Sequence, residues 1–208
     1  MPLYKTINPN SQTTVKIWKI TESFDDLLQP LQLRTESLER VSKMKSKLHR
    51  CGFLSVRHLL SLFGYSDSDL FYDDIGKPYL KDGKYISITH SFTFAAVIIS
   101  DVKVGIDIEK QRDKIAIIAH KFIGYEGDYL NADEDNYINK LTVIWGIKES
   151  LYKLFATPGM LFRKHFLVIP FMLKDEQTVA WIDYQERKYR YNTNYFEFEG
   201  FTCAYVIS

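Results

Sequence analysis

The sequence predicts an α+β fold, because strands and helices follow one another without a regular alternation. Three observations support this class. A helical pattern at 35–63 is flanked by strand-like runs, a stronger helical pattern covers 141–156, and the chain from residue 165 onwards is strand-like. No linker, low-complexity segment or short repeat divides the 208 residues, so composition marks no domain boundary.

Alternation of polar and apolar side chains, or turn chemistry, marks each element of the first half. Gly52 is the weak point of the long helix, and the polar trio Thr89-His90-Ser91 separates two strand-like runs. The expected elements are a strand at 13–20, a short helix within 22–32 that breaks near Pro30, the long helix at 35–63, a turn at Gly76-Lys77-Pro78, and the two strand-like runs within 84–100.

The second half contains the strongest helical pattern of the chain, LTVIWGIKESLYKLFA at 141–156. The run NADED is a helix-start signal ahead of it, and Asn192-Thr193-Asn194 has the composition of a turn between two strands. The expected elements are a strand at 102–110, a helix-turn-helix mixture at 114–141, the strong helix at 141–156, and strands within 165–173, 179–185, 188–200 and 201–208.

Composition and charge exclude several classes of protein. The formal net charge is +1, so no global field favours nucleic acid or a membrane surface as a partner. The two cysteines, Cys51 and Cys203, lack the spacing of a disulfide framework or zinc site, which is typical of a reducing compartment. The N-terminal stretch lacks the apolar core of a signal peptide, and no uncharged apolar run reaches the ~18 residues needed to cross a bilayer. We expect a cytoplasmic protein.

The stretch VGIDIEK (104–110) has an unusual charge pattern for a strand. Side chains alternate between the two faces of a strand, so the aliphatic residues face one way, and Gly105, Asp107 and Glu109 face the other. Two neighbouring carboxylates repel each other unless the face is fully solvated or a cation lies between them. Both interpretations remain open from this stretch alone.

The helix WGIKESLYK (145–153) carries Glu149 and Lys153 four residues apart, on one face. An exposed ion pair would explain this spacing by itself. Together with Asp107 and Glu109, however, Glu149 completes a set of three carboxylates suited to Mg²⁺, which often joins a few carboxylates to substrate phosphates. Lys153 would then offset charge on those phosphates.

Basic and imidazole side chains of the first half have ordinary interpretations as well as functional ones. His90, flanked by two hydroxyls, is either a structural hydrogen-bonding residue or a phosphate contact. Lys77 lies in a Gly-Lys-Pro stretch that a turn explains without function. Arg50 and Arg57 are seven residues apart on one helix face, where a solvated surface is the simpler explanation.

The ordered set GKPYL, ISITHSFTFAAVIIS, VGIDIEK, FIGYE and WGIKESLYK, from Gly76 to Lys153, resembles the motifs of the 4'-phosphopantetheinyl transferase superfamily. The length resembles the longer, single-chain type represented by the surfactin-synthetase activator. This resemblance implies Mg²⁺-dependent transfer of the phosphopantetheine arm of coenzyme A, the co-substrate, to a serine of an apo acyl or peptidyl carrier protein, with release of 3',5'-ADP.

The resemblance also implies a fold of two similar α/β halves in a pseudo-twofold arrangement, with coenzyme A between them. Residues 1–103 would contact the phosphates of coenzyme A, and residues 104–208 would carry the metal site and the catalytic helix. A chain with two such halves needs no second copy to complete its site, so a monomer is expected.

The motifs assign roles to individual residues by resemblance. The implied metal ligands are Asp107, Glu109 and Glu149, and the lysine acting on the transferred phosphate is Lys153. The implied coenzyme A contacts are Lys77, Thr89, His90, Ser91, Arg57 and, with a looser match, Arg50. Glu126 matches an acid that assists proton removal. The sequence departs from the family pattern at Thr89, which replaces a serine, at Gly52, where relatives commonly have an acid, and at Gly124.

Three questions stay open from the sequence. The base that takes the serine proton is Glu149, Glu126 or a metal-bound water. The acceptor is a carrier of fatty-acid, polyketide or nonribosomal peptide biosynthesis. The alternative functions are a catalytically inactive relative that binds coenzyme A or a nucleotide, and a Mg²⁺-dependent nucleotide hydrolase.

Overall fold

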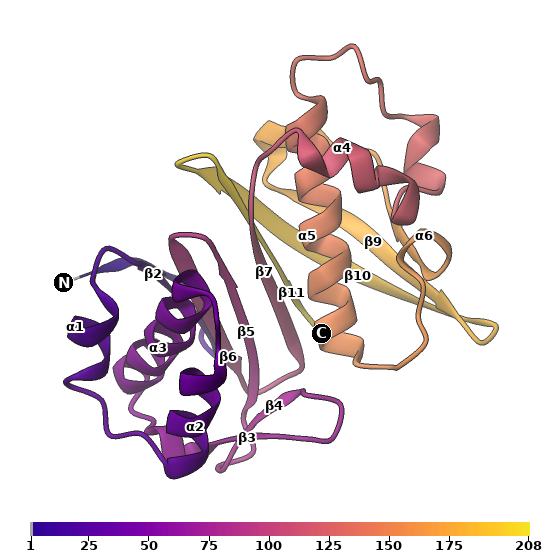
Figure 1. The fold of residues 1–208 in the computed structure, drawn as a ribbon. Coiled ribbons are helices and arrows are strands. Elements are labelled where there is room, and N and C mark those ends of the chain that lie inside the picture. The colour runs from indigo at the N-terminus through magenta and orange to yellow at the C-terminus, as the bar shows by residue number, and fades with distance from the viewer. Residues whose placement is uncertain (1) are drawn as a thin grey trace. The chain divides into compact units, whose positions relative to one another are not determined.

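The computed structural model describes residues 2–208 and has an α+β fold (Figure 1). Its internal contacts divide the chain into two compact units, one ending at Lys103 and the other beginning at Val104. Each unit combines an antiparallel sheet with a long helix that packs on it. In neither unit, as far as the described residues go, is any helix both long and apolar enough to cross a membrane.

The first unit is built on the sheet β1-β2-β6-β5, and a separate hairpin is formed by β3 and β4. Helix α3 packs on β2, β5 and β6, and its apolar residues share one core with β6. The elements are β1 (Leu3–Asn10), β2 (Thr13–Lys19), α1 (Phe24–Leu28), α2 (Thr35–Lys43), α3 (Lys47–Leu62), η1 (Asp67–Asp69), β3 (Leu70–Tyr72), β4 (Pro78–Leu80), β5 (Tyr85–Ser91) and β6 (Phe94–Ser100).

The structure corrects the predicted first half in three places. Strand β1 precedes the first predicted strand; it is an exposed edge strand without the apolar alternation that marks a half-buried one. The long helix is broken at 44–46, where Ser46 caps α3, and not at Gly52, which lies inside α3. The polar trio of residues 89–91 does not separate the strands but ends β5, and the chain turns at Phe92 and Thr93.

The second unit is built on the sheet β7-β11-β10-β9-β8. Helix α5 lies across β7 and β11 (Figure 1), and its apolar side chains form a core with strands β8, β9 and β11. The elements are β7 (Val104–Lys110), α4 (Lys114–Ile118), η2 (Ala119–Lys121), η3 (Tyr125–Asp128), α5 (Tyr137–Phe155), α6 (Phe162–His165), β8 (Phe166–Val168), η4 (Leu173–Asp175), β9 (Gln177–Tyr184), β10 (Arg187–Phe198) and β11 (Phe201–Ile207).

The turn predicted at residues 192–194 is wrong, because β10 runs through it without interruption. Thr193 is buried and pairs with Val206 on one side and Thr178 on the other, so tertiary burial overrides the local turn composition. The chain reverses instead at Gln185-Glu186 and at Glu199-Gly200, where all four residues have positive φ.

Candidate active site

Two glycines allow helix α5 to lie directly on β7 and β11. A Cβ at Gly105 would come within 1.8 Å of the carbonyl oxygen of Ser150, and a Cβ at Gly146 would come within 3.2 Å of the Cβ of Ala204. The Ser150 hydroxyl donates to the carbonyl of Ala204 at 3.0 Å and fixes this approach. As a result, Asp107, two residues after Gly105, is largely covered, with 6% of its surface exposed.

Lys153 of α5 pairs with Asp107 of β7. The Lys153 Nζ lies 2.7 Å from Asp107 Oδ1 and also donates to the carbonyl of Ile106 at 2.9 Å. The spacing of Glu149 and Lys153 indicated an ion pair within the helix, but the ion pair of Lys153 within the described chain is with the strand. The predicted strand and the predicted helix therefore bring the carboxylate of Asp107 and the ammonium group of Lys153 together.

Glu149 is the carboxylate most affected by this surrounding. The pKa of Glu149 is raised from 4.5 to about 7. Burial is the largest cause, the Asp107 carboxylate adds to the rise, Lys153 opposes it, and Glu109 makes a smaller contribution in the same direction as Asp107. The three predicted metal ligands, Asp107, Glu109 and Glu149, are thus within electrostatic reach of one another. Each would be stabilised in its charged form by a cation.

The donor set fits a hard divalent cation, because all three side chains offer carboxylate oxygens and their negative charges are crowded. Among residues 2–208, however, no three His, Cys, Asp or Glu side chains stand close enough together to hold a metal ion as they are. Lys153 neutralises Asp107 in this arrangement. The carboxylates are therefore neighbours, but they do not form a ready-made cage.

Glu126 does not lie where a catalytic base is needed, which counts against the role predicted for it. Its carboxylate is completely buried and lies 2.7 Å from the Nζ of Lys148, which is also completely buried. It accepts the N–H of Val168 at 2.8 Å and that of Gly124 at 3.1 Å. With its oxygens engaged and covered, Glu126 cannot reach a proton on a bound substrate.

In the first unit, His90 lies on a different face of β5 from Thr89 and Ser91. A Cβ at Gly52 of α3 would lie 2.9 Å from the His90 ring, so the glycine makes room for this side chain. The ring of His49 is 5.8 Å away, centre to centre. Thr89 and Ser91 are buried, whereas His90 is exposed. The predicted trio therefore offers an imidazole to solvent, not three polar groups on one surface.

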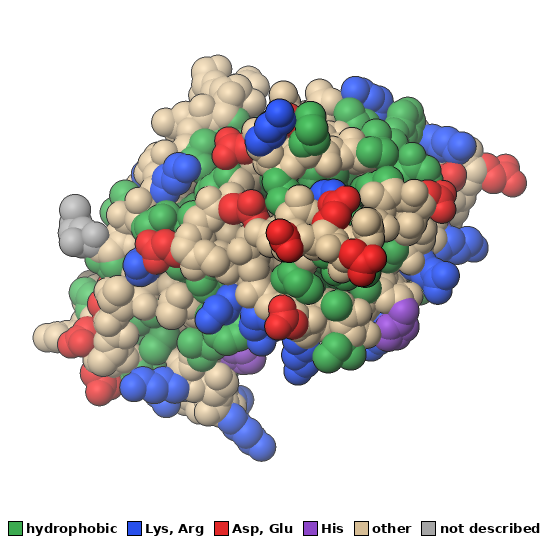
Figure 2. All heavy atoms as spheres, turned by 90° about the horizontal axis from the view of Figure 1, so that it is seen from above, with side chains coloured by type: hydrophobic (Ala, Val, Ile, Leu, Met, Phe, Trp, Pro, Cys, Tyr) green, Lys and Arg blue, Asp and Glu red, His purple; other side chains and the backbone are tan. Residues whose placement is uncertain are grey.

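Lys77 closes the hairpin between β3 and β4, where the predicted turn is confirmed. Its N–H donates to the carboxylate of Asp73, and its carbonyl accepts the N–H of the same residue. Burial, and next the nearby ammonium of Lys103, lower the pKa of Lys77, while Asp73 opposes the shift. Over the face seen in Figure 2, basic and acidic side chains are interspersed. Because no large area of this face is basic, an anion site would depend on a local pair of cations such as Lys77 and Lys103.

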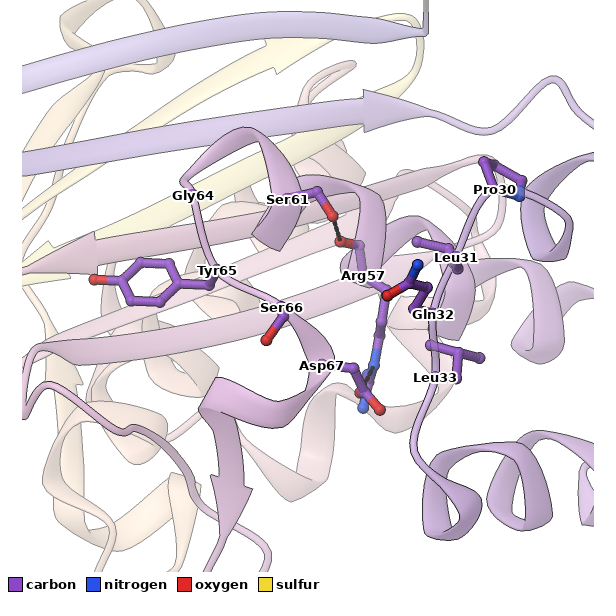
Figure 3. A pocket seen from close by; sticks show the side chains of 10 residues that line it. All are labelled: Pro30, Leu31, Gln32, Leu33, Arg57, Ser61, Gly64, Tyr65, Ser66 and Asp67. Atoms are coloured by element: carbon purple, nitrogen blue, oxygen red, sulfur yellow. Dashed lines mark hydrogen bonds and ion pairs between the residues drawn. The ribbon is translucent and has the colours of Figure 1, made fainter.

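Arg57 is a buried structural residue, which argues against its predicted contact with coenzyme A. It is 3% exposed, its Nε donates to Asp67 at 3.0 Å, and its guanidinium stacks on Phe53. It lines a cavity of about 390 Å³ (Figure 3), whose wall includes Asp67 beside it. Arg50, seven residues earlier in the same helix, stacks on Phe24, with its guanidinium carbon 3.7 Å from the ring centre.

Substitution of Arg57 by methionine is expected to destabilise the protein by about 2–4 kcal/mol, because Asp67 keeps its charge in a buried site and loses its closest cationic partner. Urea unfolding measures the change. Lys43→Met, which breaks an exposed ion pair with Glu39, is the control, with an expected change below about 0.5 kcal/mol. Equal stability of the Arg57 variant and the wild type would contradict the structural role.

The raised pKa of Glu149 makes stability depend on pH when no cation is bound. Between pH 4.5 and about 7 the folded protein holds a proton that the unfolded chain has released, so the free energy of unfolding falls as pH rises through this range. Over this pH range, we expect the free energy of unfolding of Glu149→Gln to fall by about 1–3 kcal/mol less than that of the wild type. Urea unfolding in EDTA between pH 4 and pH 8 measures it, and Glu186→Gln, in the exposed turn after β9, should leave the slope unchanged. An unchanged slope in the Glu149 variant would contradict this environment.

Sequence reasoning missed Lys148, Gly105 and Gly146 as functional positions. The pair of glycines had a signal, because each lies two residues before an acid or a lysine in a motif that was otherwise noticed. Lys148 had none, since a lysine beside Glu149 on a helix resembles an ordinary surface residue. Its burial depends on Glu126, which is 22 positions earlier in the chain.

Comparison with known proteins finds similarity over the segment that contains this site. The model of the 4'-phosphopantetheinyl transferase superfamily matches residues 103–206, half of the chain. The chain is also 27% identical, over 161 residues, to the 4'-phosphopantetheinyl transferase gsp of Aneurinibacillus migulanus. That match covers 74% of this chain and 65% of the relative, so the chain spans just under two thirds of the relative's length.

Proposed function

Because this chain belongs to the 4'-phosphopantetheinyl transferase superfamily, we propose that it transfers the phosphopantetheine arm of coenzyme A to a serine of an apo carrier protein. The serine oxygen forms a bond to the phosphorus that bears pantetheine. The bond from that phosphorus to the bridging oxygen breaks, 3',5'-ADP leaves, and the serine proton passes to a base. The observation that carries the proposal is the grouping of Asp107, Glu149 and Lys153 within the segment that the family model matches.

In this proposal, Asp107, Glu109 and Glu149 would hold Mg²⁺. When bound, the ion would supply positive charge that offsets the charge developing on the 5'-phosphate of the leaving 3',5'-ADP. Lys153, already placed beside Asp107 by its contacts with β7, adds a second positive charge on the phosphoryl oxygens. Positioning and electrostatic stabilisation would supply most of the rate acceleration, as in phosphoryl transfer generally.

Glu149 is the better side-chain candidate for the base. Its carboxylate lies within electrostatic reach of Asp107 and Lys153, whereas Glu126 is sealed in its ion pair with Lys148. Glu149 cannot hold the cation with every oxygen and also take the proton. Glu149 would therefore contribute both to holding the cation and to accepting the proton.

The coenzyme A contacts belong to the first unit. We retain Lys77 and His90, with Arg50 as an additional candidate, and leave out Arg57, Thr89 and Ser91, whose side chains are buried. In both units a long helix packs on an antiparallel sheet, which supports the proposal that the two halves have similar folds. The pseudo-twofold relation between them stays a prediction.

The carrier protein as acceptor, action as a monomer and a cytoplasmic location are part of the same proposal. The first two are implied by the family and the third by the composition, and the first two have measurements of their own. Sedimentation with and without coenzyme A tests the monomer. Candidate carriers from fatty-acid, polyketide and peptide synthesis test the acceptor.

Intact mass spectrometry of apo carriers incubated with this protein, coenzyme A and Mg²⁺ tests the reaction. We expect one carrier to gain the mass of a single phosphopantetheine arm, with 3',5'-ADP appearing in equal amount. Loss of the gain when the acceptor serine is replaced by alanine confirms the site of attachment. Nucleotide products without any carrier modification would indicate a hydrolase and overturn the proposal.

Removal of the Lys77 or the His90 side chain is expected to weaken coenzyme A binding by about 1–2 kcal/mol, with a smaller effect on the chemical step, because these residues would contact phosphates that do not react. Calorimetric titration of coenzyme A against Lys77→Ala and His90→Ala measures this. Lys81→Ala, on the exposed loop after β4, is the control. Unchanged affinity in both variants would show that the assignment at these positions is wrong.

A further inference from the structure

Lys148 is the centre of a buried polar network on helix α5. Its Nζ lies 2.7 Å from the carboxylate of Glu126 and donates to the carbonyls of Phe122 at 2.7 Å and Phe162 at 3.3 Å. Glu126 in turn accepts the N–H of Val168 at the end of β8. The network therefore ties α5 to the segment at 122–126, to the start of α6 and to β8.

This network and the sheet hold opposite sides of the same helix turn. Successive residues are rotated by about 100° around an α-helix, so Lys148 and Ser150 point in roughly opposite directions. Ser150 is fixed to β11 through the carbonyl of Ala204, and Lys148 is fixed to the segment at 122–126 through the carbonyl of Phe122. Glu149 lies between the two anchors, and Lys153, one turn on, projects from the same side.

The burial of this ion pair is not by itself evidence that its charges stabilise the fold. A buried ion pair loses much of its attraction to desolvation, and apolar or neutral pairs of similar size are often equally stable. The network has direction, however: the lysine donates to fixed carbonyls, and the carboxylate accepts fixed N–H groups. Such bonds set the rotation and the axial position of a helix more narrowly than packing does.

We propose that the Lys148–Glu126 ion pair positions Glu149 and Lys153 for the transfer reaction. This inference rests on the proposed function and gives Glu126 a role different from that of a base. Lys148 and Glu126 are positioning residues, since neither reaches solvent. They act by fixing the rotation and the axial position of α5.

The test compares the wild type with the double variant Lys148→Met/Glu126→Gln. The neutral pair has similar volume, and glutamine keeps an acceptor for the N–H of Val168. The single Lys148→Met variant leaves a lone buried carboxylate and is expected to be unstable, so the double variant carries the test. Glu134→Gln/Lys140→Met removes a partly exposed ion pair near the start of the same helix and is the matched control.

We expect the double variant to remain folded by circular dichroism and to lose about 10- to 100-fold in kcat, with KM for coenzyme A within about threefold of the wild type. The control pair should keep the wild-type kcat. A wild-type kcat in the double variant, or a loss that falls entirely in KM, would overturn the positioning role.

A second measurement does not depend on transfer. The affinity for Mn²⁺ in the presence of coenzyme A, measured by electron paramagnetic resonance of the free ion, should weaken by about tenfold in the double variant and not in the control. If the wild type modifies no carrier, the proposed function fails, while Mn²⁺ binding still decides the positioning role. Equal Mn²⁺ affinity in wild type and double variant would count against it.

Discussion

Substitution of Asp107 by asparagine is expected to reduce transfer to the carrier protein by at least about 10³-fold while the protein stays folded. Asparagine keeps the shape of the side chain but removes its charge. It therefore replaces one of the three carboxylates proposed for Mg²⁺ by a neutral amide and removes the charged partner of Lys153, which lies 2.7 Å away. Lys153 keeps its hydrogen bond to the carbonyl of Ile106 but loses the charge that holds it where it would meet the phosphate.

The rate of arm transfer, followed by intact mass, measures this loss, and thermal unfolding checks the fold. Asp113→Asn replaces an exposed carboxylate a few residues beyond the same strand and should leave the rate unchanged. The wild type should also stop in EDTA and recover on addition of Mg²⁺. Full activity in the Asp107 variant, or wild-type activity that EDTA does not affect, would remove the metal proposal.

The central strand and helix of this site could be predicted because their signals are local. VGIDIEK alternates cleanly, and the helical pattern from 141 to 156 is long and strong. The structure has β7 at Val104–Lys110 and α5 at Tyr137–Phe155, with Asp107, Glu149 and Lys153 grouped between them. Asp107 and Glu109 share a strand face because side chains alternate along a strand. Glu149 and Lys153 share a helix face because residues four apart lie about one helical turn apart.

Arg57 and Glu126 could not be assigned from the sequence, because their environment comes from distant residues. Arg57 is neutralised by Asp67 beyond the end of its helix, and Glu126 by Lys148 in the next helix. A charged residue in a motif is consistent with a ligand contact or with a buried ion pair. The partner that distinguishes the two is visible only after the chain has folded.

The failures in secondary structure have the same origin. The composition of residues 192–194 is that of a turn, but cross-strand pairing on both sides keeps Thr193 in β10. Gly52 is a weak helix former, yet it lies inside α3 because the ring of His90 occupies the space of a side chain. In each case a tertiary contact outweighs a local preference worth at most about 1 kcal/mol.

Gly105→Ala is expected to destabilise the second unit and to abolish transfer. The new Cβ would lie 1.8 Å from the backbone oxygen of Ser150 and 2.7 Å from its carbonyl carbon, whereas real Cβ contacts essentially never fall below 3.0 Å. A backbone group cannot rotate away as a side chain can, so α5 must move off the sheet. We expect a loss of about 3 kcal/mol or more in unfolding free energy, which corresponds to a fall of roughly 10 °C in Tm.

The same movement separates Lys153 from Asp107, because the strand holds one and the helix the other. Activity of Gly105→Ala should therefore be lost even at a temperature where circular dichroism shows the variant to be folded, which distinguishes misplacement from unfolding. Gly127→Ala is the matched control, since its Cβ would meet only Ile123 at an ordinary 3.7 Å. If Gly105→Ala kept both the Tm and the transfer rate of the wild type, the close approach of α5 to β7 would not be what brings the acids and the lysine together.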